Sequence, residues 1–147
     1  MWRRLITALI LLTGLAGGCA EPVGPQALIR ANIMAMETAL ADHSPLDFLE
    51  HLSESFTGGR AGQENMDREA ASRMLGLYFL RYRNIDILLS QVNVEIDPRE
   101  PALAYSSANV ALAGGERLIP NSAGLYRVSG QWQNFDGDWK LVRLEWE

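Results

Sequence analysis

The hydrophobic positions of this chain change their spacing along its length, from the period of a helix to the period of a strand. Between Gln26 and Ala41 apolar side chains recur at intervals of four, three and four residues, which places them on one stripe of an amphipathic helix: Ile29, Ile33, Met36 and Leu40. Arg30, Asn32 and Glu37 fall on the polar side of the same segment. The pattern therefore predicts a first helix over Gln26–Ala41.

Two more helices are expected before the spacing changes. Ser44 is a good N-cap and Pro45 suits the first helical position, so a short helix begins there, with Leu46, Leu49, Leu52 and Phe56 expected to face the core. Asp67 can cap a third helix from Arg68 to about Tyr82. Its apolar positions recur at helical spacing, with one glycine expected to mark close packing: Ala71, Met74, Leu75, Tyr78, Phe79, Tyr82 and Gly76.

From Asn84 onward the apolar residues alternate with polar ones, as they do in a strand that is buried on one face. The alternation changes parity part-way, from Ile85, Ile87 and Leu89 to Val92, Val94 and Ile96. A one-residue slip would turn every later side chain to the other face, so a β-bulge near Ser90 and Gln91 is needed to restore the register. Bulges bend sheets, and the pattern thus favours a strongly curved sheet.

Further strands follow, each bounded by turn residues. We expect strands over Leu103–Leu112 and from about Gly124 to Asn134, separated by a turn at Gly114 and Gly115. Asp136-Gly137 is a strong hairpin signal and leads into a last strand, Trp139–Trp146. Apolar side chains of both parities in that strand predict contacts on both faces and a central place in the sheet: Trp139, Leu141, Val142, Leu144 and Trp146.

Helices followed by a curved antiparallel sheet that closes with FDGDWKLVRLEW resemble the nuclear transport factor 2-like superfamily, which includes SnoaL-like and ketosteroid isomerase-like domains. The resemblance covers roughly residues 26–147. It implies an α+β fold in which N-terminal helices pack on a strongly curved antiparallel sheet, forming a cone with an internal pocket, and assembly as a homodimer through the sheet. The superfamily includes isomerases, dehydratases, hydrolases and members that only bind, so the fold does not specify a reaction.

The first twenty residues have the three parts of a secretory leader. Arg3 and Arg4 form a positive segment, Leu5–Leu15 is apolar, and Ala16-Gly17-Gly18 supplies small residues before a cysteine. A transmembrane helix needs about 20 apolar residues, and this run has eleven. The segment LAGGC resembles the lipobox of bacterial lipoproteins, which implies that a diacylglycerol is attached to the thiol of Cys19. An ordinary cleavable leader is the alternative, but it would leave the only cysteine of the chain as a free thiol.

These features divide the chain into a signal peptide over residues 1–18, a lipidated tether over residues 19–25 and one domain over residues 26–147. Because the leader contains two basic residues and no acidic one, the net charge of −5 becomes −7 in the mature chain. Nucleic acid is therefore not an expected partner, and anionic headgroups should repel the domain, so we expect the lipid on Cys19 to make the membrane contact. The residue after Cys19 is Ala20 rather than Asp. By resemblance to enterobacterial lipoproteins, this implies a location in the outer membrane, facing the periplasm.

The sequence contains no established catalytic or metal-binding motif. The glycine-rich stretch Thr57–Glu64 lacks the lysine and the preceding strand of a phosphate loop. Asp136 and Asp138 flank a glycine but lack the remaining ligands of a calcium loop. Nucleophile elbows, HExxH helices and CxxC pairs are also missing from the sequence. We expect no catalytic residue, no metal and no cofactor on these grounds.

The candidate pocket residues are aromatic side chains that have an apolar body and a polar tip: Tyr78, Tyr105, Tyr126 and Trp132. Ordinary core packing is the alternative for each of them. Asp47 and His51 are four residues apart and could share a helix face as an acid-base pair or as metal ligands, or could be solvated surface residues.

Two functional hypotheses follow from the sequence. The first is an envelope-anchored lipoprotein whose cone-shaped domain binds a small apolar ligand or an envelope protein without catalysis. The second is a pocket enzyme, an isomerase, dehydratase or hydrolase, that uses Tyr or Asp/His as acid and base.

Overall fold

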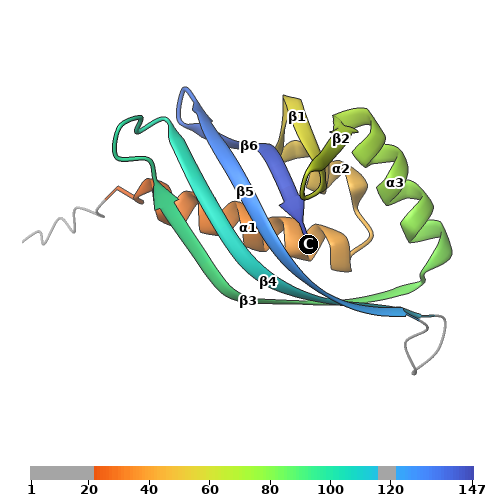
Figure 1. Ribbon diagram of the computed structural model, residues 1–147. Helices are drawn as coiled ribbons and strands as arrows, with labels where there is room; N and C mark the ends of the chain where they lie inside the picture. Colours follow the sequence, from red (N-terminus) through yellow and green to blue (C-terminus); the bar gives the residue numbers. More distant parts are fainter. Residues whose placement is uncertain (1–21, 116–121) are drawn as a thin grey trace, which may run out of the picture.

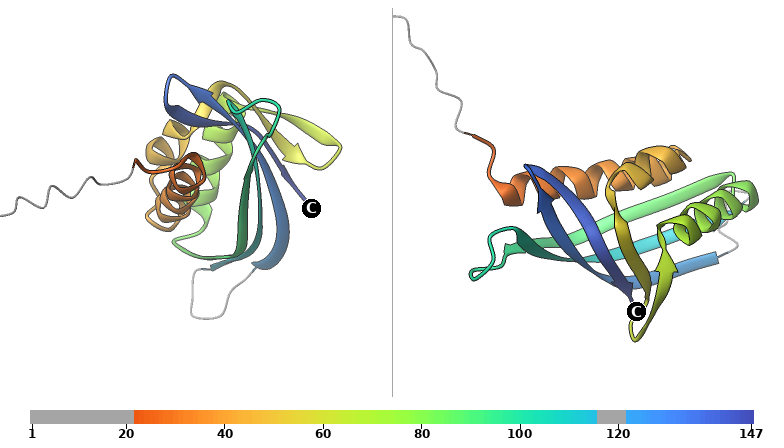
Figure 2. Two further views of the ribbon diagram at one scale, coloured as in Figure 1. Left: turned by 90° about the vertical axis from the view of Figure 1, so that its left-hand side faces the viewer. Right: turned by 90° about the horizontal axis from the view of Figure 1, so that it is seen from above.

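Three helices lie against one face of a single curved sheet in the computed structural model, which describes residues 22–115 and 122–147 (Figure 1). The two views of Figure 2 show the helices together on the concave side of the sheet. The elements, in chain order, are α1 (Pro25–Ala41), α2 (Pro45–Glu50), β1 (Leu52–Arg60), β2 (Gln63–Asp67), α3 (Arg68–Arg81), β3 (Asn84–Ile96), β4 (Leu103–Gly115), β5 (Ser122–Phe135) and β6 (Asp138–Trp146). This α+β architecture confirms the fold class expected from the sequence.

The sheet has the order β2-β1-β6-β5-β4-β3. All neighbouring strands are antiparallel except β1 and β6, which are parallel. β6 lies between β1 and β5, so the prediction of a central last strand is confirmed. The turn before it is also as expected, because Asp136 and Gly137 both have positive φ, 53° and 96°, as a type I′ hairpin requires.

Strands β1 and β2 were not predicted. The second helix ends at Glu50, and the apolar positions Leu52 and Phe56, expected on that helix, are buried on β1 instead. Leu46, expected in the core, is exposed. The sequence after His51 becomes a strand because it pairs with β6, beginning with the amide of Leu141, which donates to the carbonyl oxygen of His51 at 2.8 Å.

The predicted bulge in β3 is confirmed. The pairing register with β4 shifts between Ser90 and Asn93, and Gln91 has φ of 53°. Helix α1 covers this edge strand with side chains that the sequence placed on its polar side. Arg30 Nη1 donates to the Val92 carbonyl oxygen at 2.7 Å, and Glu37 Oε1 accepts from the Leu89 amide at 3.3 Å. These contacts satisfy backbone groups at an edge that could otherwise pair with another chain.

Two glycine predictions were wrong. Gly114 and Gly115 belong to β4 rather than to a turn, because the strand continues past Leu112. A Cβ at Gly76 would meet nothing within 4 Å, so this glycine does not mark close packing. The third helix itself is as expected, with Asp67 Oδ1 accepting from the Ala70 amide at 2.7 Å as its N-cap.

The core lies between α1 and the centre of the sheet. Its largest fully buried side chains are Trp132, Ile29 and Leu141. The indole nitrogen of Trp132 donates to Ser106 Oγ at 2.9 Å, so its single polar atom is satisfied inside the core. No helix in the described part of the chain is both long and apolar enough to cross a membrane. The predicted leader and Cys19 lie outside the described residues.

Candidate functional site

Three tyrosines come together where the end of α3 meets the concave face of the sheet. Tyr78 lies on α3, and Tyr82 is the C-cap residue one helical turn later. Their ring centroids are 4.6 Å apart, and the ring planes make an angle of 48°. Tyr126 on β5 is close enough to act electrostatically on Tyr78. All three side chains are half-buried. We call Tyr78, Tyr82 and Tyr126 the tyrosine cluster.

Two glycines of the sheet leave room for the tyrosine rings close to its backbone. A Cβ at Gly114 would be 3.1 Å from the ring of Tyr82, and a Cβ at Gly124 would be 2.5 Å from the ring of Tyr126. Any larger residue at Gly124 would therefore displace Tyr126. The rings cover the space that side chains at these positions would fill, as aromatic residues do over glycines in sheets.

The surroundings of Tyr78 disfavour the ionised form of its hydroxyl. Burial raises the pKa of the Tyr78 hydroxyl, and Tyr82 and Tyr126 raise the pKa further because a second phenolate would repel the first. A neutral phenol donates one hydrogen bond and accepts others. The cluster therefore offers hydroxyl donors beside aromatic surface, a combination that suits a mostly apolar molecule with a carbonyl or hydroxyl oxygen.

The structure separates the four aromatic residues that the sequence singled out. Tyr78 and Tyr126 belong to the cluster. Trp132 is 1% exposed and is part of the core. Tyr105 pairs with Gln131, whereas its neighbour Ala104 pairs with Trp132 on the buried side, so Tyr105 faces the opposite, convex side and is 46% exposed. Tyr105 thus does not approach the other candidates.

Sequence reasoning missed Tyr82 as a site residue, although it recognised Tyr82 as an apolar position of the third helix. The available signal was its spacing of four from Tyr78, which places the two side chains on one helix face. His43 lies beside this region. Its ring centroid is 5.0 Å from that of Phe79, and its Nε2 is 3.0 Å from the carbonyl oxygen of Tyr82. These contacts tie the loop between α1 and α2 to the end of α3.

Asp47 and His51 are joined by no hydrogen bond or ion pair in the structure, although the charge of Asp47 acts weakly on His51. His51 is the C-cap of α2, one residue beyond the helix, and Asp47 Oδ2 instead accepts from Ser44 Oγ at 2.6 Å. Among the described residues no group of three or more His, Cys, Asp or Glu side chains could hold a metal ion.

The surroundings of His51 lower the pKa of its imidazole. Burial lowers its pKa below the usual 6.5, and the charge of Lys140 lowers the pKa further, against smaller opposing effects of Glu50, Asp138 and Asp47. The folded state therefore binds a proton at His51 less readily than the unfolded state does.

We expect a pH-dependent loss of stability from this residue. The contribution of neutral His51 is fully present above pH 6.5 and is lost as the pH falls below 6.5 toward the lower folded-state pKa. Urea unfolding at pH 7 and pH 5.5 should show a larger decrease for the wild type than for His51→Gln. Lys140→Gln should reduce the difference, since it removes the second cause of the lowered pKa. Equal decreases in the wild type and His51→Gln would contradict the assignment.

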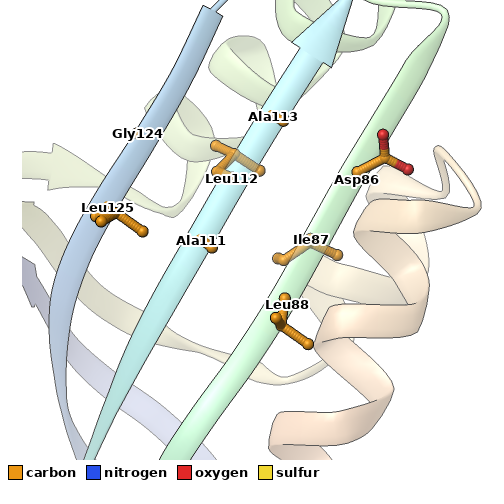
Figure 3. A pocket seen from close by; sticks show the side chains of 8 residues that line it. All are labelled: Asp86, Ile87, Leu88, Ala111, Leu112, Ala113, Gly124 and Leu125. Atoms are coloured by element: carbon orange, nitrogen blue, oxygen red, sulfur yellow. The ribbon is translucent and has the colours of Figure 1, made fainter. Parts of the chain in front are cut away.

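A hollow of about 310 Å³ lies at the same end of the sheet, over β3, β4 and β5 (Figure 3). Its walls are apolar apart from one carboxylate: Asp86, Ile87, Leu88, Ala111, Leu112, Ala113, Gly124 and Leu125. Five of the eight lining residues lie on the face of the sheet that carries Tyr105: Asp86, Leu88, Ala111, Ala113 and Leu125. Leu88 and Leu125 are exposed on this face, so the hollow opens on the convex side. It is at the small end of ligand pockets and has no converging polar groups.

Comparison with solved structures shows which fold this is. An NTF2-like protein of unknown function from Pseudomonas putida KT2440 superposes with a TM-score of 0.70 at 15% identity, covering 83% of this chain and 84% of that one. An NTF2-like protein from Cytophaga hutchinsonii matches with a TM-score of 0.67 at 16% identity, over 84% of this chain and 98% of that one. The chain has the NTF2-like fold.

The NTF2-like neighbours do not identify a reaction for this chain. One of them, from Streptomyces avermitilis, is provisionally named as a dehydratase and matches with a TM-score of 0.69 at 12% identity, over 82% of this chain and 93% of that one. No protein-family model and no curated protein matches the sequence. Proteins that share a fold at such low identities can have different functions, so the likeness shows the fold alone.

Proposed function

We propose that this protein is a lipid-anchored binding domain of the bacterial envelope, which takes a small, mostly apolar ligand at the tyrosine cluster. The single observation that carries the proposal is the convergence of three half-buried tyrosines on the concave face, with Tyr82 and Tyr126 acting on Tyr78. Tyrosine rings offer a large apolar surface at a low entropic cost, and their hydroxyls select for an acceptor atom on the ligand.

The anchor part of the proposal rests on the leader. A basic segment, an apolar run of eleven residues and LAGGC support acylation of Cys19. Two or more acyl chains hold a domain stably on a bilayer, whereas one chain does so only marginally. The ligand site would then be held at the membrane surface by covalent lipid.

The raised pKa of Tyr78 favours a role as hydrogen-bond donor over a role as general base. A general base has to be deprotonated near neutral pH, and the raised pKa of Tyr78 keeps its hydroxyl protonated instead. The groups that act on Tyr78 are two further tyrosines rather than a carboxylate or an imidazole. The geometry therefore supports hydrogen-bond donation to a ligand better than proton abstraction from a substrate.

The site is tested with Nile red, a neutral apolar dye that has a carbonyl acceptor. Tyr78→Phe and Tyr126→Phe should each weaken binding by about twofold to tenfold, the loss expected for one hydrogen bond. Fluorescence titration of the purified protein measures this change. Tyr105→Phe is the matched control, because it removes the same atom from the convex face.

The outcomes separate the alternatives. Equal losses for Tyr105→Phe and Tyr78→Phe would place the dye elsewhere, and an absence of binding would contradict the ligand site. Mass spectrometry of organic extracts from protein purified out of membranes in mild detergent should recover a co-purified apolar molecule. Turnover of a substrate that Tyr78→Phe abolishes would favour the enzyme instead.

A further inference from the structure

Helix α3 carries apolar side chains on the side that faces away from the sheet. It buries Ala71 and Leu75 toward the sheet, whereas Leu77 is 70% exposed and Leu80 is 84% exposed. Met74, three residues before Leu77, is exposed too. Spacings of three residues place these side chains along one stripe of the helix surface. Exposed leucines at such spacing indicate a contact surface rather than scattered surface residues.

Arginines flank this stripe. Arg73, Arg81 and Arg83 are all exposed. Four of the thirteen basic residues of the chain lie between Arg68 and Arg83, although the chain as a whole has a net charge of −5. Arg73 is paired with Glu69 on the same helix, and among the described residues Arg81 and Arg83 form no ion pair. The guanidinium of Arg81 lies 5.7 Å from the ring centroid of Tyr82.

We infer that the exposed side of α3, formed by Met74, Leu77 and Leu80 with Arg73, Arg81 and Arg83, contacts a bilayer that contains anionic headgroups. Leucines enter the boundary between headgroups and acyl chains, and arginines at the edge of the stripe bind phosphates. The net charge of the whole domain does not indicate this surface, because a net negative charge predicts repulsion from anionic headgroups. Residues 67–83 hold four arginines and two acidic residues, a net charge of +2, which complements the anionic headgroups.

The inference rests on the proposed function in one respect, because the lipid on Cys19 is what brings α3 close to the bilayer. The described chain begins just before α1, which lies in the same helical layer as α3 on the concave side of the sheet (Figure 2). The residues from Cys19 to Pro25 can span roughly 20 Å when extended. The tether therefore allows the helical layer to turn toward the bilayer, and tethering raises the local concentration enough for a weak contact to form.

The test places an environment-sensitive fluorophore on either side of the domain. Cys19 is the only cysteine of the chain, and acylation blocks its thiol, so Leu80→Cys and Leu125→Cys each introduce a single labelling site. Leu80 and Leu125 are matched, at 84% and 85% exposed, but lie on α3 and on the convex sheet face. Neither side chain is needed for packing, so both variants should fold.

The expected result is specific to α3. With lipidated protein in vesicles that contain phosphatidylglycerol, an NBD label at position 80 should shift to the blue and brighten by about twofold or more as it leaves water. The label at position 125 should not change. Vesicles of phosphatidylcholine alone, or added salt, should reduce the response at position 80, since headgroup attraction is screened.

Other results overturn the inference. No response at position 80 in protein that floats with the vesicles would reject the contact while leaving the anchor intact. A blue-shifted label at position 80 before vesicles are added would mean that a second copy or another part of the protein covers α3. Protein that fails to float would contradict the anchor, and the same label in a Cys19→Ser background with excess anionic vesicles would then decide the α3 contact separately.

Discussion

Trp132→Ala should lower the free energy of unfolding by about 3–5 kcal/mol, the range for truncating a large aromatic side chain in a core. Trp132 is 1% exposed on β5 and packs in the cluster that joins α1 to β6. Removing the indole leaves a cavity between the layers and leaves Ser106 Oγ without its donor. Urea unfolding followed by far-ultraviolet circular dichroism measures the change, since a single domain of this size should unfold in one transition.

Two milder variants separate packing from hydrogen bonding at this position. Trp132→Phe keeps most of the apolar volume but loses the indole donor, and Ser106→Ala removes the acceptor. Each should cost about 1–3 kcal/mol, the range for leaving a buried polar partner unpaired, and less than Trp132→Ala. A loss of under 1 kcal/mol for Trp132→Ala would place this residue outside the core and would contradict the arrangement of β5 against α1.

Cys19→Ala should abolish incorporation of labelled palmitate and release the protein from the membrane fraction. The thiol is the atom to which the lipid would be attached, and the acidic domain has little other attraction for a bilayer except the proposed α3 surface. Cells grown with labelled palmitate, followed by fractionation, measure both effects. We expect complete release from the membrane fraction, because each acyl chain contributes about 0.8 kcal/mol of membrane-binding free energy per buried methylene. Without the thiol no chain is attached.

Gly18→Ala is the matched control for the anchor. It keeps a small residue before Cys19, so processing and labelling should continue. Label that persists in Cys19→Ala would refute acylation at this residue. Loss of label in Gly18→Ala as well would show that the leader, rather than the thiol, had been damaged.

The sequence predicted the elements that depend on their own residues. The apolar stripe of α1, the Asp67 cap of α3 and the Asp136-Gly137 turn are local features, and each is present where the pattern places it. The bulge in β3 could also be read from the sequence, because the parity of buried residues has to be restored. Element order then indicated the fold class correctly.

The sequence identified two of the three tyrosines of the candidate site but not that they lie together. A tyrosine on a helix and a tyrosine on a strand can be recognised as amphipathic residues, but whether they meet depends on how α3 packs on the sheet. Tyr78 and Tyr126 meet, and Tyr105 lies on the convex face because the strand pairing turns it there. Tyr82 joined the cluster through its packing on Gly114.

The sequence by itself determined that this chain forms helices and then a curved sheet, because periods of 3.6 and 2 are set by neighbouring residues. Tertiary structure alone decided that the segment after His51 is a strand, since β1 is held by parallel pairing with β6, which is distant in sequence. It alone grouped the three tyrosines and decided which side of α3 is covered by the sheet, so that Leu77 and Leu80 stay exposed. Such groupings depend on contacts between segments far apart in sequence, which local periodicity does not encode.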